Sequence, residues 1–251
     1  CRDKRSASKT RHEIVAESGN KAIESLAADL SRQQEVRRLA EEFKARYKQL
    51  HVLINNAGIL RDRTFAKMTM DDFRAVVEVH LIGSVNATKA VWETMREQGY
   101  GRVLMTSSTS GVYGNFGQAN YGAAKAGLIG LMNVLHFEGQ KYGIHVNAVL
   151  PTAATRMTGD MMEEETLAHL SPENVVPAAL YLTSEGAPSR TALLAGAGAD
   201  HRRLAVRHRP GDAVSRAIAR PATAAHGTAG NATMAGQRCA RPAAAAPLRA
   251  G

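Results

Sequence analysis

The sequence predicts an α/β domain, a doubly wound parallel sheet with helices on both faces. Apolar runs of strand length recur at His51–Ile54, Val103–Met105 and His145–Leu150. The stretches between them are long enough for helices, and their apolar residues follow helical rather than alternating spacing. A chain of 251 residues is also long enough to bury the core that such a sheet needs.

The first fifty residues predict a helix, a strand and a second helix. Residues 6–19 are expected to form the first helix, with Gly19 as its C-cap. The segment Ala22–Ala28 fits a strand. Residues 31–48 predict a charged amphipathic helix whose apolar positions fall on one face: Val36, Leu39, Ala40 and Phe43.

The strand His51–Ile54 ends in the sequence Asn55-Asn56-Ala57-Gly58. Small residues let a backbone lie against a flat ligand, and asparagine amides can bridge neighbouring strand ends. Two helical pieces are expected over Met70–Gln98.

The stretch Arg102–Lys125 carries the clearest chemistry. Its apolar strand is followed by three hydroxyl residues, the last of them Ser108, and then by a helix that carries Tyr121 and Lys125. Residues four apart lie on one helix face, so the lysine ammonium is expected to stabilise the phenolate and lower the pKa of Tyr121. This pattern favours a site that moves a proton on an alcohol or carbonyl, although such a pair alone is more often a solvated helix face.

Three further elements are expected after this stretch. The strand His145–Leu150 is predicted to end at Pro151. Residues 158–170 are rich in Met and Glu and predict a mobile flap beside the substrate. A helix at Pro172–Leu182 and a short strand at Thr191–Ala197 complete the domain.

Residues 200–251 differ from the rest of the chain. They lack aromatic residues and a sustained apolar period, so they are expected to be a disordered tail that follows a domain of residues 1–199. Within it, residues 201–251 hold nine arginines and a single acid, which gives +8 of the net charge of +9. A nucleic-acid-binding function would therefore depend on the tail alone, which makes it the least favoured of the functions considered.

The composition also bears on compartment. No run of about 18 apolar residues predicts a membrane span, and the first residues lack the apolar core of a signal peptide. The two cysteines, Cys1 and Cys239, lie at opposite ends and predict neither a disulfide framework nor a metal site. A cytoplasmic protein is expected.

Three motifs occur together in a fixed order: the Asn-Asn-Ala-Gly sequence, Ser108, and the Tyr121/Lys125 pair. Residues 20–199 thereby resemble the short-chain dehydrogenase/reductase family, which has a Rossmann-like fold. The sequences NAGILRDR and YGNFGQANY are more specific. They resemble the (3R)-hydroxyacyl-CoA dehydrogenase unit of peroxisomal multifunctional enzymes of type 2 and its bacterial relatives.

The resemblance implies a role for each motif residue. Tyr121 would be the acid/base, Lys125 would also bind the cofactor ribose, and Ser108 would position the substrate's carbonyl oxygen. The implied cofactor-binding residues are Asp29, Leu30, Asn56, Ala57, Gly58, Tyr121, Lys125, Ala153 and Thr155. Asp29 has an alternative interpretation as the cap of the following helix.

His80 departs from the general family pattern. Most members have an asparagine here, which links the catalytic lysine to a chain of water molecules, whereas the narrower subfamily has histidine. The alternative is a packed structural histidine.

The family's first strand and its glycine-rich phosphate loop have no counterpart in this sequence, so the domain is expected to be incomplete. The glycines Gly111, Gly114 and Gly117 follow the serine rather than a first strand, and they are assigned to loop shape. NAD is the expected cofactor. NADP stays possible because Arg2, Lys4 and Arg5 would favour a 2′-phosphate, whereas Asp3 would favour NAD.

The implied function is hydride transfer between a nicotinamide cofactor and a secondary alcohol or ketone. The expected substrate is a (3R)-3-hydroxyacyl-CoA, acted on by a homodimer or homotetramer that binds neither nucleic acid nor membrane. The alternative is a catalytically inactive fragment that serves at most as a dimerising module. In a eukaryote the expected compartment is the peroxisome.

Overall fold

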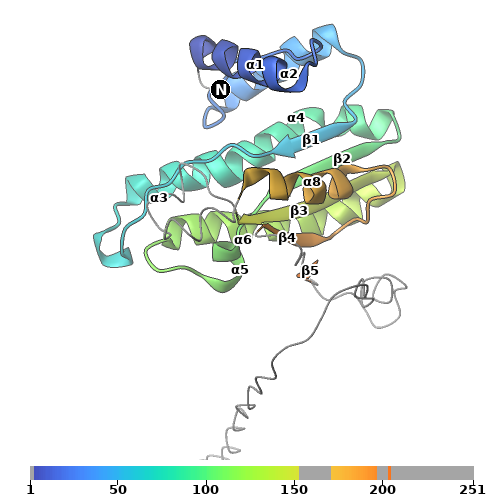
Figure 1. Ribbon diagram of the computed structural model, residues 1–251. Helices are drawn as coiled ribbons and strands as arrows, with labels where there is room; N and C mark the ends of the chain where they lie inside the picture. Colours follow the sequence, from blue (N-terminus) through green and yellow to red (C-terminus); the bar gives the residue numbers. More distant parts are fainter. Residues whose placement is uncertain (1–2, 153–170, 197–202, 205–251) are drawn as a thin grey trace, which may run out of the picture. The chain divides into compact units, whose positions relative to one another are not determined.

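The computed structural model describes residues 3–152, 171–196 and 203–204. The chain divides into two units, Cys1–Arg207 and His208–Gly251, and every described residue belongs to the first. Five strands of this unit form one sheet in the order β1-β2-β3-β4-β5 (Figure 1). Neighbours among the first four pair in parallel, and β5 pairs antiparallel with β4. The strands are β1 Val52–Asn55, β2 Gly101–Thr106, β3 Ile144–Thr152, β4 Ala192–Gly196 and β5 Arg203–Leu204.

Helices connect and flank these strands. The α-helices are α1 Lys4–Ser18, α2 Gln33–Arg46, α3 Met70–Val77, α4 Gly83–Glu97, α5 Thr109–Tyr113, α6 Ala119–Gly139 and α8 Val176–Thr183. A π-helix, Glu78–Ile82, joins α3 to α4, and short 3₁₀ helices span Phe65–Lys67, Gln140–Tyr142 and Pro172–Val175. The two helical pieces predicted within Met70–Gln98 are thus confirmed, and a π-turn joins them.

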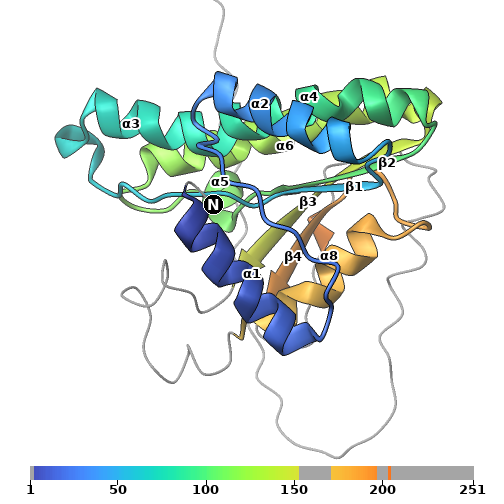
Figure 2. The same cartoon turned by 90° about the horizontal axis from the view of Figure 1, so that it is seen from above.

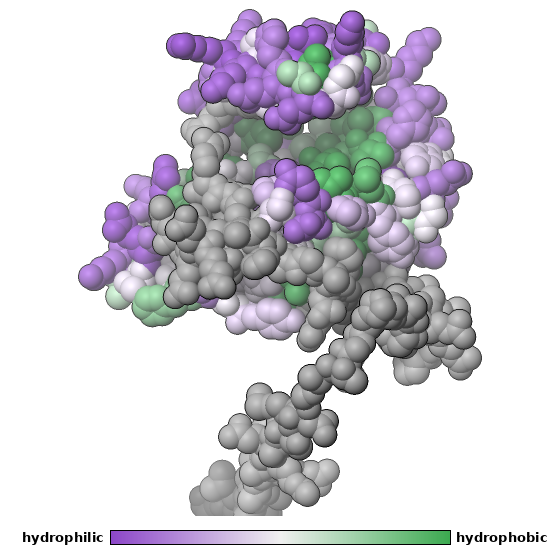
Figure 3. Space-filling model, in the orientation of Figure 1, coloured by the Kyte–Doolittle hydropathy of each residue, from purple (hydrophilic) through white to green (hydrophobic). Residues whose placement is uncertain are grey.

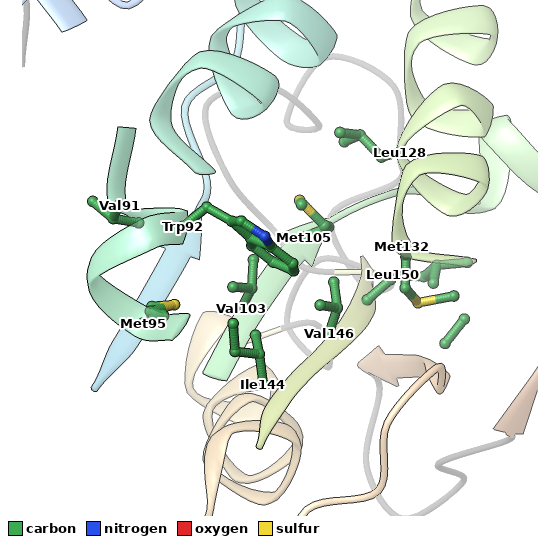
Figure 4. Packing of buried hydrophobic residues seen from close by; sticks show 12 residues of the cluster. Val91, Trp92, Met95, Val103, Met105, Leu128, Met132, Ile144, Val146 and Leu150 are labelled. Atoms are coloured by element: carbon green, nitrogen blue, oxygen red, sulfur yellow. The ribbon is translucent and has the colours of Figure 1, made fainter. Parts of the chain in front are cut away.

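The sheet separates two apolar layers because successive strand residues point to opposite faces. In β2, Val103 and Met105 contact one layer and Leu104 the other. The first layer contains Trp92 of α4 and Met132 of α6, which pack with the strand residues shown in Figure 4. The second layer is formed by α8, so helices lie on both sides of the sheet (Figure 2). The predicted fold class is confirmed.

The local signals at the first helix also hold. Asp3 accepts a hydrogen bond from the backbone N–H of Ser6, and Gly19 ends the helix with a φ of 68°. That left-handed conformation is readily available only to glycine, as the predicted C-cap requires.

The prediction of a strand at Ala22–Ala28 is wrong, because these residues form neither a helix nor a strand. A strand needs a neighbour to satisfy its backbone groups, and the described residues pair no strand with this segment. Two of its carbonyls accept hydrogen bonds from side chains instead: Arg11 donates to the carbonyl of Ile23, and Arg38 donates to that of Ala27.

The outer edge of β1 likewise has no partner strand among the described residues. Val52 and Ile54 are 36% and 51% exposed. Figure 3 shows apolar side chains gathered in a hollow over this strand.

Two later predictions need correction. Pro151 does not end the third predicted strand, because β3 runs through it to Thr152 and Pro151 pairs with Ala195. The strand Arg203–Leu204 lies within the stretch predicted to be disordered. The flap predicted at residues 158–170 falls outside the described residues, as does the rest of the tail. No described helix has the length and apolar character needed to cross a membrane.

Candidate active site

The site lies at the carboxyl ends of β1 and β2. The register pairs Asn55 with Met105, so Asn56–Gly58 and Ser107–Ser108 leave the sheet at the same edge. Ligands of open α/β sheets bind outside this edge.

Ser108 and Tyr121 meet at this edge. Ser108 is the N-cap of α5, where its hydroxyl accepts a hydrogen bond of 3.2 Å from the backbone N–H of Ser110. The side chain of Ser108 also lies close enough to the phenol of Tyr121, in the first turn of α6, to lower the pKa of the phenol. The serine and tyrosine predicted to act together are therefore brought into contact.

Lys125 is buried one helical turn beyond Tyr121. Its Nζ donates a 2.5 Å hydrogen bond to the carbonyl of Thr106 and lies 5.4 Å from the centre of the Tyr121 ring. The hydroxyl of Ser107 donates to the carbonyl of Lys125, which fixes the helix to the end of β2. Burial lowers the pKa of Lys125 from 10.5 to about 8.

The pKa of Tyr121 differs from the predicted direction. Burial raises it, the hydrogen bond from Ser108 opposes the rise, and the negative charge of Asp62 adds to it. Desolvation disfavours the charged form of both Tyr121 and Lys125, and in the protein alone this outweighs the expected stabilisation of the phenolate.

His80 adjoins this pair from the π-helix. Its ring is 1% exposed and meets the Tyr121 ring edge-on, with centroids 5.1 Å apart. Its Nε2 lies 2.7 Å from the carbonyl and 3.0 Å from the N–H of Ile59, so either tautomer finds a partner there. Nδ1 has no hydrogen-bond partner among the described residues. Burial, with a contribution from Lys125, lowers the pKa of His80 to about 4, so the ring is neutral near pH 7.

Gly111 allows the close approach of α5 to α6. A Cβ at this position would lie 2.7 Å from backbone atoms of Lys125 and Ala126, nearer than real Cβ atoms come. This glycine therefore lets α5 pack directly against α6. The prediction that it serves loop shape is wrong, because Gly111 lies within helix α5.

The predicted cofactor residues lie in different surroundings, and only some of them lie near Tyr121. Gly58 lies against the His80 ring, which connects Asn56–Gly58 to the Tyr121 side of the site. Asp29 forms a turn, accepting hydrogen bonds from the N–H and hydroxyl of Ser31, while Arg32 is the N-cap of α2. The carbonyl of Leu30 lies near Gly83 at the start of α4. Ala153 and Thr155 are outside the described residues.

Sequence reasoning missed a polar network around Tyr121. Gln118 and Asn120, both buried, hold the loop that contains Asp62 against the start of α6. The signal was available, since these residues belong to NAGILRDR and YGNFGQANY, which had been noted only as marks of resemblance. Among the described residues, no group of three or more His, Cys, Asp or Glu side chains is arranged to hold a metal ion.

A parallel sheet with a Ser–Tyr–Lys cluster at its carboxyl edge defines the class of a nicotinamide-dependent oxidoreductase. The family model described as short chain dehydrogenase matches residues 2–166. The chain belongs to the short-chain dehydrogenase/reductase family, whose members are NAD(P)-dependent oxidoreductases.

Relatives and solved structures agree with this assignment. The chain is 46% identical to a short-chain type dehydrogenase/reductase of Mycobacterium tuberculosis, over 74% of this chain and 66% of the relative. It is 48% identical to peroxisomal multifunctional enzyme type 2 of Mus musculus, over 60% of this chain and 20% of the relative. A short chain dehydrogenase from Mycobacterium avium has a similar structure, with a TM-score of 0.66 and 32% identity over 79% of this chain and 70% of that one. The chain thus spans about two thirds and one fifth of the lengths of these two curated relatives.

The described residues fit one half of a nicotinamide dinucleotide. Of the three donors on Lys125 Nζ, one is used by Thr106, which leaves two for the hydroxyls of a ribose. Where the structure is described, no glycine-rich turn leads from a strand into a helix to hold the pyrophosphate.

Proposed function

We propose that this site interconverts a secondary alcohol and a ketone, and that its substrate is a (3R)-3-hydroxyacyl-CoA. The observation that carries the proposal is the gathering of three side chains: Ser108 lies close enough to the Tyr121 phenol to lower its pKa, and the buried Lys125 Nζ lies 5.4 Å from the centre of the Tyr121 ring. A nicotinamide cofactor, when bound, accepts or supplies the hydride.

The chain's own groups handle the proton and the oxygen. Tyr121 takes the hydroxyl proton during oxidation and returns it during reduction. Ser108 holds the same oxygen and counters the effect of burial on the phenol. Lys125, fixed by Thr106, binds the ribose hydroxyls and supplies positive charge next to the ring.

The proposal extends to NAD as the preferred cofactor, to Asp29, Leu30 and Asn56–Gly58 as residues of the adenosine side, and to Ala153 and Thr155 near the nicotinamide. It is supported by NAGILRDR and YGNFGQANY, which form one connected structure beside Tyr121. The compartment is proposed to be the cytoplasm, or the peroxisome in a eukaryote.

The test is reduction of NAD by the purified chain, followed by absorbance of the reduced cofactor. (3R)-3-hydroxybutanoyl-CoA is expected to react, with the (3S) isomer and NADP as comparisons. Equal rates for the two isomers would reject the proposed stereochemistry. Turnover that survives in the Tyr121→Phe variant would reject the site.

We also propose that the chain forms a homodimer or homotetramer through α4 and α6. Val134 and Phe137 of α6 are 54% and 61% exposed, and a shallow cavity of about 120 Å³ lies between the two helices, lined by Trp92, Leu131 and Leu135. Apolar area of this kind on a helix favours burial against a partner. Light scattering of the chain and of its Phe137→Glu variant tests this: a monomeric parent would contradict it.

A further inference from the structure

Helix α5 turns its small residues towards α6 and its large residues towards solvent. On the α6 side, the Ser110 hydroxyl donates a 2.8 Å hydrogen bond to Oε1 of Gln118, and Gly111 packs against the backbone of α6. Val112 and Tyr113, on the same helical turn, are 41% and 70% exposed. The side of α5 that is turned away from α6 is therefore apolar and open to solvent.

The turn after α5 continues this apolar surface. Gly114 and Gly117 have φ values of 80° and 78°, which only glycine adopts without strain, and Phe116 between them is 88% exposed. Two hydrogen bonds fix the turn: Asn115 Nδ2 donates to Oε1 of Gln118 at 3.1 Å, and the N–H of Gln118 donates to the carbonyl of Asn115 at 3.2 Å. Exposed apolar side chains that gather on a fixed backbone are typical of a binding surface.

The surface begins at the serine of the candidate site. Ser108 caps α5, and a helical rise of about 1.5 Å per residue places Val112 and Tyr113 about 6–8 Å along the helix from it. A chain attached to the carbon whose oxygen Ser108 holds can therefore reach both side chains. No charged residue occurs between Arg102 and Lys125. Because phosphates are usually bound by Arg or Lys, the surface suits an uncharged apolar chain rather than the phosphates of a coenzyme.

We propose that Val112, Tyr113 and Phe116 bind the acyl chain of the substrate, so that the site prefers (3R)-3-hydroxyacyl thioesters with long chains to the four-carbon one. The inference rests on the proposed function. An acyl chain that lies on these side chains is removed from water along one side. Burial of about 55 Å² of apolar area corresponds to about a tenfold gain in affinity.

The variants Tyr113→Ser and Phe116→Ser remove exposed rings without opening the core. The measurement is kcat/KM for the NAD-dependent oxidation of (3R)-3-hydroxybutanoyl-CoA and (3R)-3-hydroxydodecanoyl-CoA. Each variant is expected to lower the ratio of the dodecanoyl value to the butanoyl value about tenfold. Equal losses for the two substrates would place the rings against the coenzyme half of the substrate and would overturn the proposal.

The variant Leu180→Ser is the matched control. Leu180 is 65% exposed on α8, a helix that ends where the carbonyl of Ser184 accepts a hydrogen bond from Arg102, at the amino end of β2. This control removes a comparable apolar side chain near the opposite edge of the sheet, so it should leave the ratio unchanged. Light scattering that shows a smaller assembly for Tyr113→Ser than for the parent would assign the surface to a subunit contact and would overturn the proposal.

A second readout does not depend on turnover. Dodecanoyl-CoA and butanoyl-CoA lack the 3-hydroxyl group and cannot react, so calorimetric titration gives their affinities directly. The parent chain should bind dodecanoyl-CoA at least about tenfold more tightly than butanoyl-CoA, and Tyr113→Ser should remove most of this difference. If neither hydroxyacyl-CoA is oxidised, the proposed function fails, and the titration then decides whether the surface binds an acyl chain. Equal affinities of the parent for the two thioesters, or a difference that survives in both variants, would overturn the inference.

Discussion

Replacement of Gly58 by alanine tests how tightly the Asn-Asn-Ala-Gly sequence is packed against the site. A Cβ at residue 58 would lie 2.5 Å from Cε1 of His80 and 3.3 Å from both of its ring nitrogens. The ring cannot give way freely, because Nε2 is bonded to the backbone of Ile59 and the ring packs edge-on against Tyr121. The clash must therefore be relieved by moving His80 or the loop.

The expected destabilisation follows from these contacts. Overpacking of a filled core costs about 1–3 kcal/mol. Loss of the hydrogen bond to Ile59 adds about 1 kcal/mol. Gly58→Ala should thus lower the free energy of unfolding by about 2–4 kcal/mol.

Urea unfolding followed by circular dichroism gives this free energy for Gly58→Ala, His80→Asn and the double variant. If the clash is the cause, Gly58→Ala should cost less than about 1 kcal/mol in the His80→Asn background, since the two residues are in contact. Gly186→Ala is the control, because nothing lies within 4 Å of a Cβ there. It should be neutral or slightly stabilising. An alanine at residue 58 that costs the same in both backgrounds would refute the reasoning.

Three further predictions concern the groups around the phenol. Tyr121→Phe should lower kcat/KM by at least about 100-fold while cofactor affinity, measured by calorimetry, stays nearly unchanged, because only the transferable proton is lost. Burial depresses the pKa of Lys125 from 10.5 to about 8, so as pH rises the folded state loses this proton before the unfolded state does. The free energy of unfolding of the wild type, relative to that of Lys125→Met, should therefore rise by about 2 kcal/mol from pH 8 to 10.5. An unchanged difference in urea unfolding across this range would contradict it. The pKa of His80 is likewise lowered, from 6.5 to about 4, so its contribution is complete above pH 6.5 and is lost as pH falls towards 4. His80→Asn should flatten that acid limb of the unfolding profile.

The part of the fold that depends on local pattern was predictable from sequence. The apolar runs at His51–Ile54, Val103–Met105 and His145–Leu150 coincide with the parallel strands β1, β2 and β3 to within two residues at each end, and the cap at Gly19 ended α1 as expected. The segment Ala22–Ala28 had an equally plausible strand pattern but formed none. Strand formation depends on a neighbour that a local pattern cannot supply.

The candidate site likewise has features that local spacing predicted and features that depend on the packed structure. The spacing of Tyr121 and Lys125 predicted that both lie on one helix face. The sequence also predicted that the serine before α5 lies beside the phenol, as the structure has it. The direction of the Tyr121 pKa was wrong because burial depends on the whole packed structure. The roles of Gln118 and Asp62 were missed because their hydrogen bond joins residues 56 positions apart.

Burying the ammonium of Lys125 at the site lowers the stability of the domain. Burial alone accounts for the lowered pKa of Lys125, and Nζ donates its hydrogen bond to a backbone carbonyl rather than to a carboxylate. A buried ammonium without an ionic partner is destabilising, and a packed apolar residue of similar volume would remove that cost. Yet α6 cannot turn Lys125 towards solvent without also withdrawing Tyr121, since the two share one helix face. The close contact at Gly111 and the bond from Ser107 therefore hold the helix in an orientation that favours chemistry over stability.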